Sequence, residues 1–232
     1  NSTIGNFGNL RLEGVISGSG DLDKWGSGFL ALSGNNTHTG RLIVNQGIVS
    51  IEAAAAVPTG NIVLNNGSAI YFSTYSADQT YAGTISGTGG VVQAGPGTLT
   101  LTGINTYTGG TALGAGYNGT LAVAADASLG NAPGVISFQG GRLKFLSSFD
   151  LASTRTVSVT AYGGTFALYG ATTTFGGVIE DTGRLTIEGP GTMTFTGANT
   201  YSGGTTVQGG AALAIGSDAR LGTGDLILDG ST

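Results

Sequence analysis

Short stretches of alternating apolar and polar residues recur along the whole chain. Phe29–Leu32, Thr98–Leu101 and Thr192–Phe195 are four residues each. Alternation with period two places every second side chain on one buried face of a β-strand. Most of these stretches end at Gly or Asn-Gly, and the alanine run 53–56 is closed off by Pro58 and Gly60. The pattern predicts an all-β chain of many short strands joined by glycine turns, with almost no helix.

Three long segments of the chain share landmarks at equal offsets. Each opens at a glycine (Gly14, Gly83 and Gly177), and these openings are 69 and 94 residues apart. Gly-X-Gly follows 12 residues after each opening, and Asn-Thr with a ring begins 22 residues after it. The rings are His38, Tyr107 and Tyr201. We therefore expect three long repeat copies near residues 14–82, 83–176 and 177–232.

The second copy is longer than the first in two places. Four of the additional residues lie around Gly114–Gly119, and about 21 lie between Phe145 and Gly177. A solenoid accepts only whole turns if neighbouring strands are to stay in register. The longer insertion therefore predicts one additional turn.

These features together favour a right-handed parallel β-helix over other all-β folds. Membrane barrels need strands of about 9–11 residues, and a sandwich does not explain a repeat that grows by one unit. In a β-helix the strands of successive turns pair above and below, and glycine and asparagine form the corners. We expect residues 1–232 to form one continuous solenoid of roughly ten turns, with three turns in each long copy.

Residues 97–111 and 191–207 give the chain a family resemblance. They read GTLTLTGINTYTGGT and GTMTFTGANTYSGGTTV, which closely resemble the autotransporter-associated β-strand repeat, also called the passenger-associated transport repeat. The first copy departs from this pattern at His38 and Arg41, where the family favours Tyr and Gly-Thr.

The resemblance implies a passenger domain of type V secretion in a Gram-negative bacterium. Such a passenger is exported across the outer membrane through a C-terminal translocator β-barrel and folds outside the cell, at the cell surface. We expect a structural display stalk or adhesin-type segment that is itself non-catalytic, with a host-surface protein or glycan as partner. The alternatives are a β-helix polysaccharide lyase or hydrolase, and the stalk of a protease- or esterase-bearing passenger.

Composition and charge narrow the partners. The chain has 45 glycines, 9% charged residues and a net charge of −5. Its only two lysines are Lys24 and Lys144, so no basic patch can neutralise phosphates, and we expect neither nucleic acid nor direct membrane insertion. Cysteine is absent, so no disulfide holds the core together. Because the chain starts at Asn1 and has no recognisable signal peptide, we expect a fragment of a longer protein.

Four groups of residues suggest chemistry, and each has a structural explanation that we prefer. His38 aligns with two tyrosines, so its position favours a ring. Gly114–Gly119 reads G-x-G-x-x-G but precedes a strand, whereas a phosphate site needs a helix N-terminus. Glu180 and Asp181, the only adjacent acidic pair, fall near a turn. Isolated acidic pairs resemble single units of a calcium-binding roll without the neighbouring copy that completes a site; they are Asp21 with Asp23 and Asp225 with Asp229. We expect no catalytic site, cofactor or metal.

Two further sets concern ligand binding. Asn36, Asn105 and Asn199 are expected about 14 Å or more apart along the axis, too far to share a small ligand, so we assign them to corners. Exposed aromatic rings are candidates for binding a host glycan or protein. The candidate rings are Trp25, Tyr71, Tyr75, Tyr81, Tyr117, Tyr162 and Tyr169.

Overall fold

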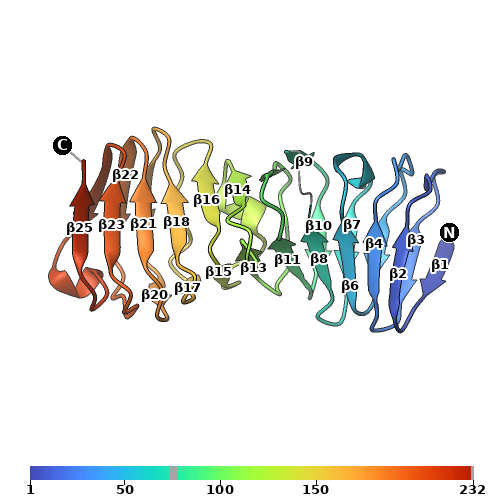
Figure 1. The fold of residues 1–232 in the computed structure, drawn as a ribbon, viewed down its shortest axis with the longest axis horizontal. Helices are drawn as coiled ribbons and strands as arrows, with labels where there is room; N and C mark the ends of the chain where they lie inside the picture. The colour runs from blue at the N-terminus through green and yellow to red at the C-terminus, as the bar shows by residue number, and fades with distance from the viewer. Residues whose placement is uncertain (74–77, 231–232) are drawn as a thin grey trace.

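The computed structural model describes residues 1–73 and 78–230. They form a parallel β-solenoid of about eleven turns, with the two ends of the chain at opposite ends of the molecule (Figure 1). Every strand pairing in the described chain is parallel and joins strands of successive turns. The repeated short strands therefore stack exactly one turn apart, as the alternating pattern predicts.

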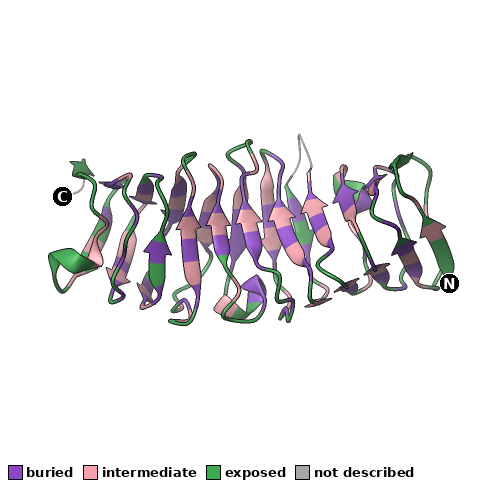
Figure 2. Ribbon diagram, turned by 90° about the horizontal axis from the view of Figure 1, so that it is seen from below, coloured by how far each residue is buried: buried purple, intermediate pink, exposed green. Residues whose placement is uncertain are grey.

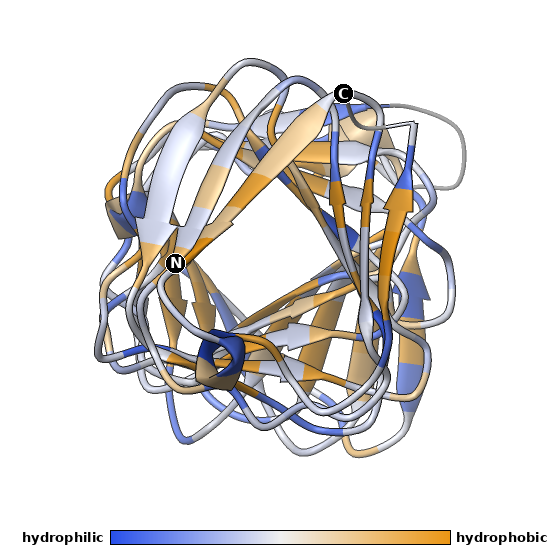
Figure 3. Cartoon of the chain, turned by 90° about the vertical axis from the view of Figure 1, so that its left-hand side faces the viewer, coloured by the Kyte–Doolittle hydropathy of each residue, from blue (hydrophilic) through white to orange (hydrophobic). Residues whose placement is uncertain are grey.

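Each turn passes over three faces, which we call A, B and C, and Figure 3 shows them along the solenoid axis. Face A carries β1 (Ser2–Gly5), β3 (Leu22–Trp25), β5 (Leu42–Val44), β7 (Ile62–Leu64), β10 (Ile85–Gly87), β19 (Thr172–Phe175), β22 (Gly191–Phe195) and β24 (Ala211–Ile215). Between β10 and β19 this face is built from loops, which pair through backbone hydrogen bonds such as Thr106 N–H to Ile85 O at 2.8 Å.

The other two faces hold longer sheets. Face B carries β2 (Asn9–Leu12), β4 (Phe29–Leu32), β6 (Ile48–Ile51), β8 (Ala69–Phe72), β11 (Gly90–Gln93), β13 (Thr111–Leu113), β15 (Ile136–Phe138), β17 (Thr156–Val159) and β20 (Val178–Glu180). Face C carries β9 (Gln79–Tyr81), β12 (Thr98–Leu101), β14 (Thr120–Val123), β16 (Arg142–Phe145), β18 (Gly164–Ala167), β21 (Leu185–Glu188), β23 (Thr205–Gln208) and β25 (Leu226–Asp229).

Helical structure is limited to three single 3-10 turns in the described residues. They are η1 (Ala54–Ala56), η2 (Asp126–Leu129) and η3 (Asp218–Arg220). None of the described helices has the length and apolar character needed to cross a lipid bilayer.

The core is a set of ladders of inward side chains. Figure 2 shows the buried residues recurring on the strands along the solenoid. On face C one ladder runs through residues that are register partners in successive turns, each at most 1% exposed: Leu99, Leu121, Leu143, Phe166, Ile187 and Val207. Burying one such side chain stabilises the fold by about 1.5–3 kcal/mol. A one-residue slip would turn a whole ladder outward, so the hydrophobic pattern itself fixes the register.

The three repeat copies begin on three different faces. Their equivalent strands are β4 on face B, β12 on face C and β22 on face A. Three turns from Phe29 lead through Ile48 and Ala69 to Gly90, and the remaining residues to Thr98 cross one corner. Copies one and two are therefore three turns and one face apart, and copies two and three are four turns and one face apart. The expectation of three whole turns per copy was wrong, because a turn is shorter than one third of 69 residues.

The additional turn itself is present. On face C it runs from Arg142 to its partner Thr165, a step of 23 residues rather than 21. Sequence alignment located the turn but not its length, because corners gain or lose residues without changing the register of the strands.

Candidate ligand-binding surface

The three asparagines of the repeat lie inside the solenoid and connect its turns. Asn105 is 2% exposed; its Oδ1 accepts from Ile85 N–H at 2.8 Å, and its Nδ2 donates to Ser128 O at 2.7 Å. Asn36 and Asn199 each make the same pair of contacts, to the turn before and the turn after. Each side chain therefore bridges three turns at a place where the backbone is not in a strand, which is a structural role different from the corner role that we expected.

The ring that follows each asparagine is also internal. The hydroxyl of Tyr107 pairs with Thr111 Oγ1 at 2.6 Å, and Tyr201 pairs with Thr205 in the same way. His38 is 2% exposed, but the residue four positions later is Leu42, and neither imidazole nitrogen has a hydrogen-bond partner. Burial lowers the pKa of His38 from its usual value because the charged form loses its hydration.

Two buried side chains bind the backbone of the Gly-X-Gly corners. Lys24 Nζ donates to Gly26 O at 2.6 Å and to Gln46 O at 3.0 Å, and burial lowers its pKa. Gln93, the equivalent residue of the second copy, donates to Gly95 O at 2.7 Å and Gly97 O at 3.0 Å. Both side chains bind carbonyls of the tight corner, and Gly97 O also accepts from Thr120 N–H at 3.1 Å.

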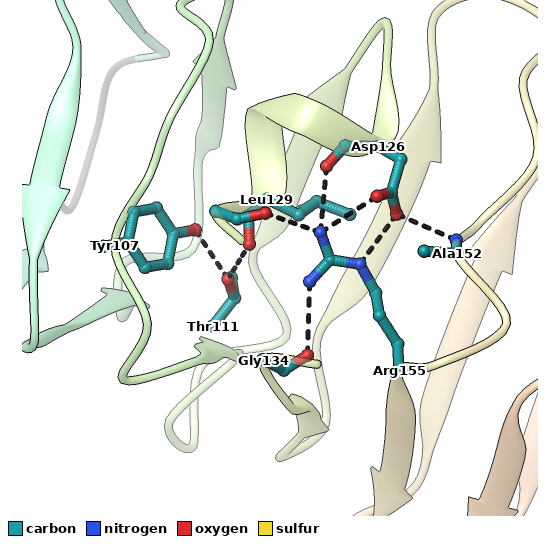
Figure 4. A network of polar contacts seen from close by, with 8 residues as sticks. Tyr107, Thr111, Asp126, Leu129, Gly134, Ala152 and Arg155 are labelled. Carbon is teal, nitrogen blue, oxygen red and sulfur yellow. Dashed lines mark hydrogen bonds and ion pairs between the residues drawn. The ribbon is translucent and has the colours of Figure 1, made fainter. Parts of the chain in front are cut away.

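A network of polar contacts surrounds Arg155, which is 1% exposed (Figure 4). Its Nε and Nη2 bind the carboxylate of Asp126 at 2.7 and 3.0 Å. The same guanidinium donates to Gly130 O at 2.7 Å and to Gly134 O at 3.2 Å. Arg155 thus ties η2 and the loop after it to the next turn, where face A has no strand. Its scattered position among the arginines gave no sign of this in the sequence.

The acidic candidates do not assemble into a site. Asp21 is ion-paired with Arg41 at 2.6 Å, and this hydrogen bond lowers the pKa of its carboxyl group. Asp181 has a φ of 88° and accepts from Ser158 Oγ at 3.0 Å and from Thr182 N–H at 2.9 Å, so it forms a turn. Within residues 1–73 and 78–230, no three His, Asp or Glu side chains lie close enough to hold a metal ion.

The Gly114–Gly119 loop connects β13 to β14. Gly114, Ala115, Gly116 and Asn118 all have positive φ, and a strand follows the loop. These residues form a loop between two strands, which is the loop insertion that the sequence indicated.

The candidate aromatic rings divide into buried and exposed ones. Tyr81 is buried and Tyr71 is half-buried, while Tyr75 lies outside the described residues. The exposed rings are Trp25, Tyr117, Tyr162 and Tyr169. Of these, Tyr162 and Tyr169 flank β18 on face C, one at each corner.

Tyr169 stands beside two depressions. The larger, about 370 Å³, is lined by Tyr169, Glu188, Gly189, Gln208, Gly209 and Asp229. The smaller, about 210 Å³, lies toward residues 145–148. Lys144 Nζ sits 4.6 Å from the centre of the Tyr169 ring, a cation–π contact. This corner combines an exposed ring with carboxylate and amide groups, which is a composition suited to binding rather than to proton transfer.

Comparison with known proteins supplies the context for this surface. Residues 22–51, 91–123 and 185–215 match the family described as the passenger-associated-transport-repeat. The chain is 31% identical over 201 residues to the adhesin BmaC autotransporter of Brucella suis biovar 1 (strain 1330). That match includes 73% of this chain but only 6% of the relative, so the chain spans a small part of that protein's length. No solved structure matched.

Proposed function

The chain is a segment of an autotransporter passenger, and we propose that it serves as a non-catalytic display stalk that also contributes adhesive surface. The observation that carries this is the uninterrupted stack of about eleven parallel turns, which makes the described chain long in one direction (Figure 1). A passenger of this class is displayed outside the cell after export across the outer membrane, and its full-length protein carries a C-terminal translocator β-barrel.

The stalk part of the proposal rests on how the turns are connected. Each turn contacts only its neighbours, so length is added turn by turn without a change elsewhere. The asparagine bridges and the Arg155 network hold the turns together where strands are missing. These contacts stabilise an extended rod, and they leave the outward faces free to vary.

The adhesive part rests on the relative's name and on the exposed rings. BmaC is named an adhesin, and we extend that role to this chain. Exposed tyrosine rings at the corners of face C offer large, rigid contact area at low entropic cost, which is how adhesive protein surfaces gain affinity.

Two deletions of whole turns in the full-length protein test this proposal. Removing residues 22–84 joins residue 21 to Ile85, which follows Leu22 by three turns in register. Removing residues 142–205 joins residue 141 to Thr206, three turns after Arg142. Both variants keep their strand faces in phase, so we expect both to be displayed on cells, as measured by surface antibody labelling.

Measuring adhesion of the displaying cells to host cells and matrix then separates the stalk role from the adhesive role. We expect the 22–84 deletion to keep most adhesion and the 142–205 deletion, which removes Tyr162 and Tyr169, to lose it. Turnover of an acidic or neutral polysaccharide that disappears in Glu180→Gln or Asp181→Asn would instead establish the lyase or hydrolase alternative. Adhesion no greater than that of cells expressing the translocator alone would remove the adhesive part of the proposal.

A further inference from the structure

Tyr169 occupies a position where the neighbouring turns have glycine. At the corner that follows face C, Gly189 lies against the backbone of Tyr169, and Gly209 lies against the backbone of Gly189. The φ values of Tyr169, Gly189 and Gly209 are +48°, +78° and +65°. This left-handed region is open to glycine and costly for a bulky side chain. A tyrosine is therefore poorly suited to the backbone at this corner.

The ring of Tyr169 does not pack in the core. Tyr169 is 57% exposed, and its ring makes a cation–π contact with Lys144 from the turn before. That contact is at the surface, where such pairs contribute little. Strained backbone clusters at functional sites, ligand clamps among them, so an exposed bulky ring held at this φ is a candidate for contact with a ligand.

The glycines beside the ring create the space for that ligand. Because Gly189 and Gly209 have no side chains, the depression of about 370 Å³ extends over two turns next to Tyr169. This volume lies at the lower end of the roughly 300–1,000 Å³ of small-molecule clefts. Its flank is formed by Glu188 and Gln208, adjacent partners in the ladder of face C.

Planar polar groups on that flank are held in place. Glu188 is ion-paired with Arg142, and Gln208 Nε2 donates to Glu188 Oε2 at 3.3 Å. The pair offers a carboxylate acceptor and an amide that both donates and accepts, which is the inventory needed to bind hydroxyl groups. Asp229 also lines the depression. The carboxylates of Glu188 and Asp229 together disfavour an anionic ligand.

We propose that the corner at Tyr169 binds a neutral oligosaccharide: the apolar face of one pyranose ring stacks on Tyr169, and its hydroxyls bind Glu188 and Gln208. This inference rests on the adhesive function proposed above and names its partner class. Glu188 sets the specificity, because its charge excludes sialylated and other acidic glycans and keeps Arg142 occupied.

The experiment measures binding of the full-length passenger to an array of neutral and sialylated oligosaccharides, together with its thermal unfolding. Tyr169→Gly should lose neutral-glycan binding by at least about tenfold, while the melting temperature stays equal or rises because glycine relieves the backbone. Trp25→Ala, which removes an exposed ring on face A outside the depression, is the control and should bind as the wild type does. Glu188→Gln should raise binding of sialylated relative to neutral glycans, because Arg142 is released.

Three results would overturn the inference. They are a wild type that binds no neutral glycan, a Tyr169→Gly variant that binds as well as the wild type, and a Tyr169→Gly variant that melts lower, which would make the ring structural. If displaying cells still adhere in any of these cases, the proposed stalk and adhesin function stands without the glycan site. If adhesion depends on Tyr169 but follows a matrix protein instead of a glycan, the partner class is wrong.

Discussion

Replacing Asn105 by alanine tests how the turns are held together where strands are absent. The change leaves two buried backbone groups without partners: the N–H of Ile85 and the carbonyl of Ser128, which Asn105 contacts at 2.8 and 2.7 Å. Ile85 and Ser128 are 0% and 4% exposed, so water cannot readily replace the amide. An unsatisfied buried group costs about 1–3 kcal/mol, and we expect Asn105→Ala to destabilise the fold by about 2–6 kcal/mol.

The control is a similar contact at the surface. Asn61 Oδ1 accepts from Thr84 N–H at 3.0 Å in an exposed position, where water can take its place, so Asn61→Ala should cost only about 0.5–1 kcal/mol. Asn105→Asp adds a third arm, because the carboxylate still accepts from Ile85 but places a second acceptor against the carbonyl of Ser128. Urea unfolding gives the free energies, and amide hydrogen exchange at Ile85 reports the local opening. If Asn105→Ala and Asn61→Ala differ by less than about 0.5 kcal/mol, the asparagine does not bridge the turns as described.

Three further changes follow from the buried polar residues. Arg155→Met should destabilise the fold by about 3–5 kcal/mol, because Asp126 keeps a charge without its partner; a urea midpoint within error of the wild type would contradict the network. His38→Phe should raise stability at pH 7 by removing two unpartnered nitrogens, and it should also flatten the pH dependence. In the wild type the pKa of His38 is lower in the folded state than its usual 6.5, so the unfolded chain binds more protons and stability falls as pH drops from about 6.5 through the folded pKa; an equal slope in His38→Phe would refute this. Lys24→Gln should be tolerated, since Gln93 binds the equivalent corner, whereas Lys24→Leu leaves the carbonyls unpaired and should lower the melting temperature clearly below that of Lys24→Gln.

The sequence was most informative about the strands. Alternation such as that of Thr98–Leu101 has one physical outcome in a stacked sheet, because each strand must send its apolar side chains to the same interior as the strands above and below. The matched offsets of the three copies then fixed a solenoid, and the additional residues after Phe145 predicted its additional turn. The family resemblance rested on the same residues, so class and location followed from the sequence as well.

Tertiary structure decided how the copies are placed and which side chains act. Whether a copy ends after a whole turn depends on the lengths of its corners. Added together, these lengths place the start of the next copy on the next face, and no single motif in the sequence shows this. Asn105 was predicted to form a corner because a sequence cannot show that backbone groups of the turns above and below need the side chain as their partner. The same holds for Tyr169: its meaning comes from the glycines at Gly189 and Gly209, about 20 and 40 residues away, which become its neighbours only when successive turns stack about 4.8 Å apart.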